Sequence, residues 1–222
     1  MTPKSALFFA AGLGTRMAPL TNDRPKPMVN VAGKPLLFHA LDLAEGLTCV
    51  VNVHYKAEQI RDSVPADVHI SDETDLLRET GGGLKHALPL LGDGPVFTMN
   101  TDAVWRGDNP FDTLRQHWRD DMDGLLLLVN KDNALGHTGQ GDFLTDEAGR
   151  IRRGAGAIYT GCQIIRTADL DEVMEQSFSM WKLWNRMLAR GTLYGVEYNG
   201  KWCDVGRPES IAVAEGMLSD DV

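Results

Sequence analysis

Residues 6–27 read ALFFAAGLGTRMAPLTNDRPKP, a short apolar run that ends abruptly in a loop rich in glycine and proline. The run Ala6–Ala10 does not alternate between apolar and polar residues, which is typical of a strand that is buried on both faces. Open α/β sheets bind their ligands in the loops that directly follow such strands. This stretch therefore predicts a parallel sheet with a binding site at the end of its first strand.

The rest of the chain repeats this arrangement of buried strands and amphipathic helices. Apolar runs predict further strands at 49–53, 68–71, 96–100, 125–130, 158–166 and 192–198. Apolar residues at helical spacing predict helices at 34–45, 58–64, 81–91, 111–118, 170–176, 180–189 and 209–218. Buried strands that alternate with helices are typical of the α/β class, here with a doubly wound, mostly parallel sheet.

The domain organisation follows from a change of pattern near residue 130. Before it, strands and helices alternate regularly, whereas a hairpin at 142–152 and less regular segments follow it. The 222 residues have the size of one generous domain, and no linker-like or repeated segment interrupts them. We expect a single domain over 1–222, in which 1–130 are doubly wound and 131–222 form a smaller mixed lobe.

The composition limits the partners and the location of the protein. Against 31 Asp and Glu there are only 22 Lys and Arg, which gives a formal net charge of −9. This excess of acid argues against nucleic acid and against anionic membrane surfaces, because both attract basic proteins. The longest apolar runs are far too short to span a bilayer. Three cysteines without a CxxC pair favour a reducing compartment, so we expect a cytoplasmic protein.

The loop after the first strand carries groups that suit a phosphate chain. Gly12 and Gly14 would let backbone N–H groups approach phosphate oxygens. The guanidinium of Arg16 can donate two hydrogen bonds to one phosphate, and Lys26, held between two prolines, is a preorganised cation. The loop is not the dinucleotide-binding motif, because Met17 stands where its third glycine would be.

Carboxylates follow two other apolar segments, Asp102 in the string NTD (100–102) and Asp204 in the string WCDVG (202–206). A carboxylate just past a buried strand can bind Mg²⁺ through oxygen, although each string also fits an ordinary turn. A third string, ETGGG (79–83), opens a predicted helix. A glycine-rich helix N-terminus is a place for an anion or for the edge of a base, and it also fits a flexible loop.

Together these strings resemble the sugar-1-phosphate nucleotidyltransferase family. Its signature loop, GxGTRxxPLTxxxPKP, is matched at every fixed position by residues 12–27, and the resemblance covers essentially the whole chain. The resemblance implies a Rossmann-like nucleotidyltransferase fold, in which 1–130 would form the nucleotide-binding part and 131–222 the smaller sugar-binding lobe. It also implies an enzyme that joins a nucleoside triphosphate to a sugar 1-phosphate and releases pyrophosphate.

The same resemblance implies roles for individual residues. Arg16 and Lys26 would be the catalytic cations, and Asp102 and Asp204 would hold Mg²⁺, although the family more often has glycine where this chain has Thr101. The residues that would bind the nucleotide are Ala10, Ala11, Gly12, Gly14, Thr15, Thr80 and Gly81. The residues that would bind the sugar phosphate are Gly141, Asp142, Gly161 and Lys182, of which Lys182 equally fits a solvated helix position.

Three strings, ETGGG (79–83), HTGQGDF (137–143) and KWCDVG (201–206), narrow the resemblance. They are similar to family members that transfer UMP from UTP to N-acetylmuramate α-1-phosphate in cell-wall recycling. The hexapeptide repeats typical of longer members are absent from the sequence. Only charge suggests a residue for the lactyl carboxylate of that sugar, and the candidates are Arg78, Arg106 and Lys131.

Two alternatives remain open at this point. One is a glucose- or mannose-1-phosphate nucleotidyltransferase that uses UTP, dTTP or GTP. The other is a non-catalytic nucleotide-sugar sensor on the same fold, although such proteins usually lack one of the two basic or two acidic site residues that this chain retains. The expected partners are UTP and a sugar 1-phosphate, bound by a monomer or a small homo-oligomer.

Overall fold

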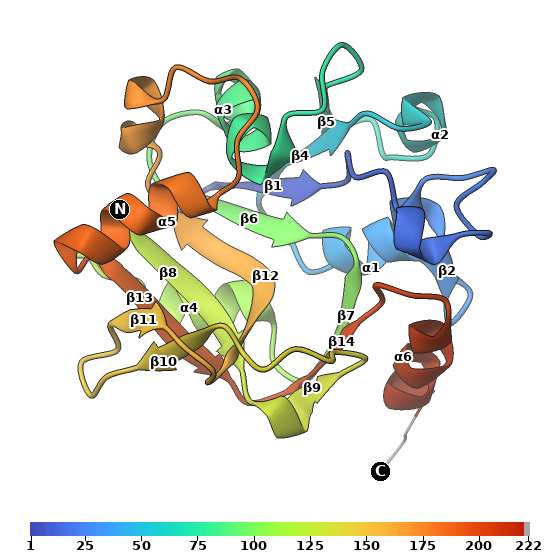
Figure 1. Ribbon diagram of the computed structural model, residues 1–222. Coiled ribbons are helices and arrows are strands. Elements are labelled where there is room, and N and C mark those ends of the chain that lie inside the picture. Colours follow the sequence, from blue (N-terminus) through green and yellow to red (C-terminus); the bar gives the residue numbers. More distant parts are fainter. Residues whose placement is uncertain (220–222) are drawn as a thin grey trace.

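A seven-stranded sheet forms the centre of the protein (Figure 1). The structure, a computed structural model, describes residues 1–219, and residues 220–222 of the predicted domain lie outside the described residues. The strand order is β13-β8-β12-β6-β1-β4-β5. These strands are β1 (Ser5–Phe9), β4 (Thr48–Val53), β5 (His69–Asp72), β6 (Val96–Asn100), β8 (Gly124–Val129), β12 (Ile158–Ile165) and β13 (Leu193–Tyr198).

The sheet is mostly parallel, as predicted. The pairs β4–β5, β1–β4, β1–β6 and β8–β13 are all parallel. The exception is β12, which is inserted between β6 and β8 and runs antiparallel to both. Strands β12 and β13 both lie beyond residue 130 in the sequence. The C-terminal part of the chain therefore contributes two strands to the same sheet as β1.

Helices cover both faces of the sheet, which confirms the doubly wound α/β class (Figure 1). They are α1 (Leu36–Leu41), α2 (Ala57–Arg61), α3 (Glu79–Leu91), α4 (Pro110–His117), α5 (Trp181–Arg190) and α6 (Glu209–Ser219). One core packs α1, α2 and α4 against the sheet, and the other packs α3 and α5. In β1, Phe8 belongs to the first core and Leu7 to the second, because successive side chains of a strand point to opposite faces.

A second, three-stranded sheet lies beside the carboxyl end of β6. It consists of β7 (Ala103–Arg106), β14 (Lys201–Asp204) and β9 (Ala134–Leu135), in the order β7-β14-β9. The sequence pattern did not indicate these short strands. The remaining pairs are the predicted hairpin of β10 (Phe143–Thr145) and β11 (Ile151–Arg153) and the short pair of β2 (Asn30–Val31) and β3 (Lys34–Pro35).

Three predicted helices differ from the structure, and the smallest difference is at 58–64, where α2 already ends at Arg61. The segment 34–45 contains strand β3 and only six helical residues, because Pro35 in extended conformation precedes α1. The segment 170–176 is not an α-helix: a 3-10 helix, η4 (Ala168–Glu172), ends before Val173, which is extended. After this segment the chain passes beside the N-terminus of α3, where the Phe178 carbonyl accepts hydrogen bonds from the N–H groups of Gly81 and Gly82. Among the described residues, no helix is long and apolar enough to cross a membrane.

Candidate active site

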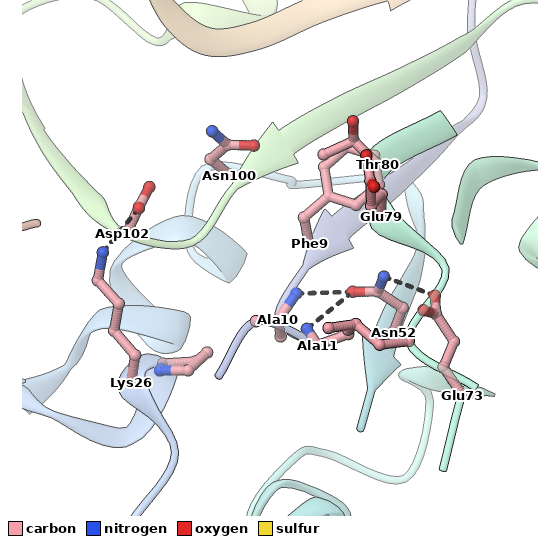
Figure 2. Close-up of a pocket in the computed structure, with 13 residues that line it drawn as sticks. Phe9, Ala10, Ala11, Lys26, Asn52, Glu73, Glu79, Thr80, Asn100 and Asp102 are labelled. Carbon is pink, nitrogen blue, oxygen red and sulfur yellow. Dashed lines mark hydrogen bonds and ion pairs between the residues drawn. The ribbon is translucent and has the colours of Figure 1, made fainter. Parts of the chain in front are cut away.

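A cavity of about 280 Å³ lies beyond the carboxyl ends of β1, β4 and β6 (Figure 2). This is the edge of a parallel sheet where ligand sites are expected. The residues that line it are Phe9, Ala10, Ala11, Gly12, Lys26, Pro27, Asn52, Glu73, Leu77, Glu79, Thr80, Asn100 and Asp102. They include the predicted nucleotide-binding residues Ala10, Ala11, Gly12 and Thr80, and they bring Lys26 and Asp102 to the same cavity.

A buried polar pair under this cavity was missed by the sequence analysis. The Asn52 side-chain oxygen accepts hydrogen bonds from the backbone N–H groups of Ala10 (2.6 Å) and Ala11 (3.3 Å). Its amide donates to the Glu73 carboxylate at 2.7 Å (Figure 2). Glu73 is fully buried, and burial raises the pKa of its carboxyl. The only signal in the sequence was a polar residue, Asn52, inside an otherwise apolar strand.

Gly14 brings the two halves of the signature loop together. Its φ of +64° is in the left-handed region that favours glycine, and a Cβ here would lie 2.9 Å from the Cβ of Lys26. The Thr21 hydroxyl donates to the Gly14 carbonyl at 3.0 Å and closes the loop. Thr15 and Arg16 lie exposed in a short 3-10 helix, η1 (Thr15–Met17). Gly14 therefore acts through close packing on the lysine segment.

The small sheet brings the two predicted metal ligands together. Asp204 ends β14, and its register partner on β7 is Ala103, the residue after Asp102. The Val205 N–H donates to the Asp102 carbonyl at 2.8 Å, so the two backbones are joined at this point. Burial, and then the charge of Asp102, raises the pKa of the Asp204 carboxyl. Thr101 fits locally, because it is buried and its hydroxyl donates to the Phe9 carbonyl at 2.8 Å.

This pair suits a divalent cation. Lys26 Nζ lies 2.7 Å from a carboxylate oxygen of Asp102, so a positive charge already balances one of the two acids. Mg²⁺ prefers oxygen ligands and is commonly held by one or two carboxylates together with substrate phosphates. Asp102 and Asp204 fit this requirement. The described residues contain no group of three or more His, Cys, Asp or Glu side chains that could hold a metal ion by themselves.

The N-terminus of α3 is only partly available to a ligand. Thr80 lines the main cavity, and its side-chain oxygen accepts a hydrogen bond from the Met180 N–H at 3.0 Å. The N–H groups of Gly81 and Gly82 both donate to the Phe178 carbonyl, at 2.9 and 3.0 Å. Gly81 is therefore engaged with the chain before α5, and at this helix end Thr80 is the predicted residue that faces the cavity.

The predicted sugar-phosphate residues are divided between several places. A second cavity of about 200 Å³ is lined by Asp142 and also by Thr80, so it adjoins the nucleotide side. The Asp142 carboxylate accepts the Tyr159 N–H at 2.8 Å. Gly161 is positioned against Asn100, with its Cβ position 2.8 Å from the Asn100 side chain, and Gly141 is packed in the same manner on the Gly156 backbone.

Lys182 and the three residues suggested by charge lie elsewhere. The Lys182 ammonium forms an ion pair with Glu175 and lies over the Phe178 ring. Arg78 pairs with Asp75 at 2.9 Å and lines a different groove, beside α3. The structure thus brings together the signature loop, Lys26 and the two predicted metal ligands. Arg106 donates to the Met217 carbonyl at 3.1 Å, and Lys131 is exposed.

Comparison with known proteins gives consistent matches. Residues 6–172 match the family model of the MobA-like NTP transferase domain. An N-acetylmuramate alpha-1-phosphate uridylyltransferase from Caulobacter vibrioides is 40% identical, over 98% of this chain and 98% of that protein. A mannose-1-phosphate guanylyltransferase catalytic subunit beta from Drosophila melanogaster is 29% identical, over 92% of this chain and 60% of that protein.

A solved structure, that of HddC from Yersinia pseudotuberculosis complexed with GMP-PN, has the same fold. Its TM-score is 0.76 at 24% identity, over 97% of this chain and 100% of that chain. The family model matches well over half of the chain, and the Caulobacter relative aligns along nearly all of it. The chain therefore belongs to the MobA-like NTP transferase family and, within it, to the sugar-1-phosphate nucleotidyltransferases.

Proposed function

We propose that the protein transfers UMP from UTP to N-acetylmuramate α-1-phosphate, which gives the UDP-sugar and pyrophosphate as a step of cell-wall recycling. The observation that carries this proposal is the 40% identity to a uridylyltransferase of this type along nearly the full length of both chains. The site supports the reaction class, because Lys26, Asp102 and Asp204 meet beside a cavity that the signature loop lines.

The reaction requires positioning and charge neutralisation. A phosphate oxygen of the sugar 1-phosphate attacks the α-phosphorus of UTP, a new P–O bond forms, and the bond to the β-phosphate breaks. The attacking oxygen is already an anion, so no side chain has to remove a proton. Arg16 and Lys26 would stabilise the negative charge of the triphosphate and of the departing pyrophosphate. Arg16 is exposed on η1, so its guanidinium is open to a ligand.

Asp102 and Asp204 would hold Mg²⁺, and the bound cation would supply positive charge that offsets the negative charge of phosphate oxygens. Lys26 and Thr101 would keep this pair of carboxylates in position. The Lys26 side chain, 12% exposed, keeps the Asp102 carboxylate in place through its ammonium group, and the Thr101 hydroxyl fixes the backbone beside Asp102. The positive charge of Lys26 also offsets part of the negative charge of the two carboxylates, which by itself would repel a triphosphate.

The remaining predicted residues would position the substrates. Those proposed for the nucleotide are Ala10, Ala11, Gly12, Gly14, Thr15, Thr80 and Gly81, and those proposed for the sugar phosphate are Gly141, Asp142, Gly161 and Lys182. Asn52 fixes the nucleotide side, because it holds the N–H groups of Ala10 and Ala11 in one geometry. Lys182 would have to leave Glu175 to reach a sugar phosphate.

A mannose-1-phosphate guanylyltransferase is the second candidate, on the basis of the Drosophila relative, which is 29% identical. A matrix of substrates separates the two. Pyrophosphate release is measured with UTP, dTTP, GTP and CTP against the 1-phosphates of N-acetylmuramate, N-acetylglucosamine, glucose and mannose. We expect the highest kcat/KM with UTP and N-acetylmuramate 1-phosphate. Preference for another pair overturns the substrate assignment, and no release with any pair favours a non-catalytic sensor.

We also propose a cytoplasmic location. The three cysteines are free thiols, and Cys162 and Cys203 are buried. Unpaired thiols of this kind are in keeping with a reducing compartment. The acidic net charge of −9 supports a small anionic substrate rather than nucleic acid or a membrane surface as the partner.

A further inference from the structure

Unpartnered polar atoms gather at the small sheet beside the two carboxylates. Among the described residues, five buried side-chain nitrogen or oxygen atoms have no hydrogen-bond partner, and three of them belong to Trp105, His137 and Trp202. Trp105 and Trp202 are register partners on β7 and β14. The His137 ring lies 6.1 Å from the Trp202 ring, measured between centroids. Buried polar groups are normally satisfied, so this concentration requires a physical explanation.

His137 stands at the start of a loop that connects the metal side with the sugar side. The loop follows β9, which pairs with β14, and leads to Asp142 in the second cavity. The preceding residue, Gly136, is pressed against the backbone of Asp204: its Cβ position would be 2.3 Å from the Asp204 carbonyl oxygen. His137 therefore follows directly on a residue that packs against the Asp204 backbone.

The imidazole is covered by its own loop. Nε2 of His137 is buried, and a Cβ at Gly139 would lie only 2.3 Å from it, so the glycine backbone packs directly on this nitrogen. The Gly139 backbone gives Nε2 no hydrogen bond. A hydrogen bond from Nε2–H to an anionic oxygen would therefore be more favourable than this contact. A ligand oxygen that displaced the Gly139 backbone would give Nε2 the partner that it lacks.

We propose that His137 is a substrate-binding residue whose Nε2–H donates a hydrogen bond to a phosphate oxygen of the sugar 1-phosphate. This inference rests on the proposed function. A phosphate is the ligand that the placement favours, because the reacting phosphate of the sugar has to lie beside Asp204 and the sugar beyond it, on the side of Asp142. His137 is on the loop that joins these two residues.

The test compares two replacements of His137. His137→Phe keeps a ring of similar size but removes the donor, whereas His137→Gln keeps an N–H donor at a similar reach. We expect His137→Phe to raise the KM for the sugar 1-phosphate about 10- to 100-fold, the effect of losing one hydrogen bond to a charged group. The KM for UTP should change little, and His137→Gln should recover part of the loss.

The matched control is His117→Phe. His117 is an exposed histidine on α4 whose Nδ1 contacts the Thr113 carbonyl at 2.8 Å, and its replacement should leave both KM values unchanged. Thermal melting shows whether each variant is folded. The sugar is tested as N-acetylmuramate 1-phosphate and as N-acetylglucosamine 1-phosphate, which lacks the lactyl carboxylate, and the rise in KM should be similar for both.

Three results would overturn the role of His137. They are an unchanged KM for the sugar 1-phosphate in folded His137→Phe, an equal rise in the KM for UTP, and a rise confined to N-acetylmuramate 1-phosphate, which would assign the contact to the carboxylate. If the wild-type protein releases no pyrophosphate with any pair of substrates, the proposed function itself fails, and the inference fails with it. If the wild-type protein is active, a negative result with His137→Phe concerns only the role of His137 and leaves the proposed function intact.

Discussion

The pairing of Lys26 with Asp102 is the contact on which the candidate site depends at the scale of residues. Lys26 Nζ lies 2.7 Å from the carboxylate, and the lysine side chain is largely buried. The prolines on both sides of Lys26 and the close approach of Gly14 fix its backbone. A charge that is held in place before the substrate binds needs no rearrangement when negative charge develops on the phosphates.

Replacing Asp102 tests this pair directly. Asp102→Ala removes one of the two carboxylates but keeps the backbone carbonyl that accepts the Val205 N–H, so the fold should survive. We expect kcat for pyrophosphate release with Mg²⁺ to fall about 100- to 1,000-fold, as when other preorganised electrostatic groups are removed. Circular dichroism should be unchanged. Asp93→Ala, which removes an exposed carboxylate from a turn, is the control, and near-normal turnover of Asp102→Ala would contradict the metal assignment.

Glu73 predicts a pH dependence of stability. Burial raises the pKa of its carboxyl in the folded state, so the folded protein holds this proton to a higher pH than the unfolded chain does. The contribution of Glu73 to stability is therefore largest below the ordinary glutamate pKa of 4.5 and is lost as the pH rises through its folded pKa. Glu73→Gln should flatten this decline in the free energy of unfolding, measured with urea from pH 4 to pH 8.

A neighbouring residue is the control with the opposite sign. The backbone hydrogen bond from Thr74 lowers the pKa of Asp72 to about 2. The stabilising contribution of Asp72 is present above the ordinary aspartate pKa of 3.8 and is lost as the pH falls through the folded pKa. Asp72→Asn should therefore leave the slope above pH 4 intact. A slope that persists in Glu73→Gln would assign the pH dependence to another group.

Residues in local strings could be predicted from the sequence, whereas partners joined by tertiary contact could not. Arg16 and Lys26 stand in one continuous motif, and Asp102 follows a strand that was predicted at its observed limits, Val96–Asn100. Asn52 and Glu73 are 21 residues apart, and only the side-by-side arrangement of β4 and β5 brings them together. No local spacing indicates that contact.

At the scale of elements, strand direction was the main feature that the pattern could not supply. The apolar run of β12 predicts a buried strand, but hydrophobicity is the same for both directions, so its antiparallel insertion between β6 and β8 was not predictable. The short strands β7 and β14 were missed because four residues are too few for a clear periodicity. Their pairing nevertheless determines where Asp204 lies relative to Asp102.

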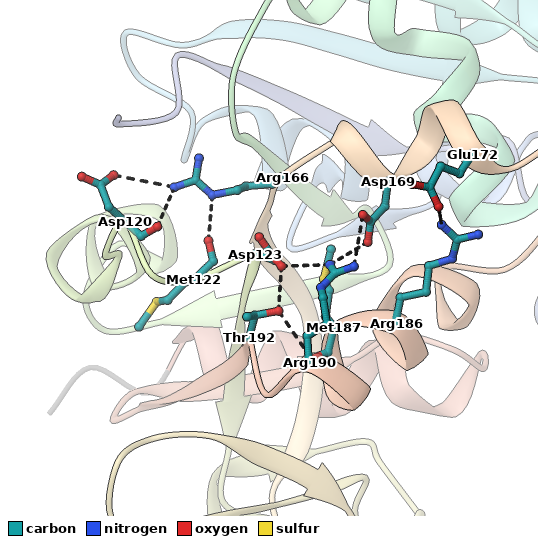
Figure 3. A network of polar contacts seen from close by, with 10 residues as sticks. All are labelled: Asp120, Met122, Asp123, Arg166, Asp169, Glu172, Arg186, Met187, Arg190 and Thr192. Carbon is teal, nitrogen blue, oxygen red and sulfur yellow. Dashed lines mark hydrogen bonds and ion pairs between the residues drawn. The ribbon is translucent and has the colours of Figure 1, made fainter.

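A polar network fastens α5 to the edge of the sheet (Figure 3). Arg190, the last residue of α5, donates to both oxygens of Asp169, at 2.7 and 3.2 Å, and to Asp123 at 2.8 Å. Thr192 donates to the same Asp123 oxygen at 2.7 Å. One guanidinium thus links the end of a helix, the 3-10 helix η4 and the residue before β8.

We expect Arg190→Ala to lower the free energy of unfolding by about 1 kcal/mol, the upper range for partly exposed ion pairs, because the arginine engages two carboxylates. Urea unfolding measures this loss. Arg186→Ala on the same helix is the control: Arg186 has a single ion pair with Glu172, which is 72% exposed, and its loss should cost less than about 0.5 kcal/mol. Equal losses in the two variants would show that the network adds nothing beyond a surface pair.

At the scale of the whole molecule, the net charge of −9 opposes the binding of a free triphosphate. Asp204 adds to this opposition at the site, because the Lys26 ammonium is already paired with the other carboxylate, that of Asp102. A divalent cation bound to the nucleotide offsets the charge of the triphosphate, which weakens its repulsion by the acidic chain and by the acidic site. The acidity of the chain therefore predicts that UTP binds well only together with Mg²⁺.

Thermal melting in the presence of ligands measures this coupling. A ligand that binds only the folded state at 100 times its Kd stabilises it by about 2.7 kcal/mol. For a chain of this size that corresponds to a rise in Tm of roughly 5–10 °C. We expect this rise with UTP and Mg²⁺, and a much smaller one with UTP and a chelator. In Asp204→Asn the difference between the two conditions should largely disappear, because one of the two carboxylates that would hold the cation is gone. An equal rise with and without Mg²⁺ would mean that Arg16 and Lys26 alone overcome the acidic field, and the two carboxylates would then need another role.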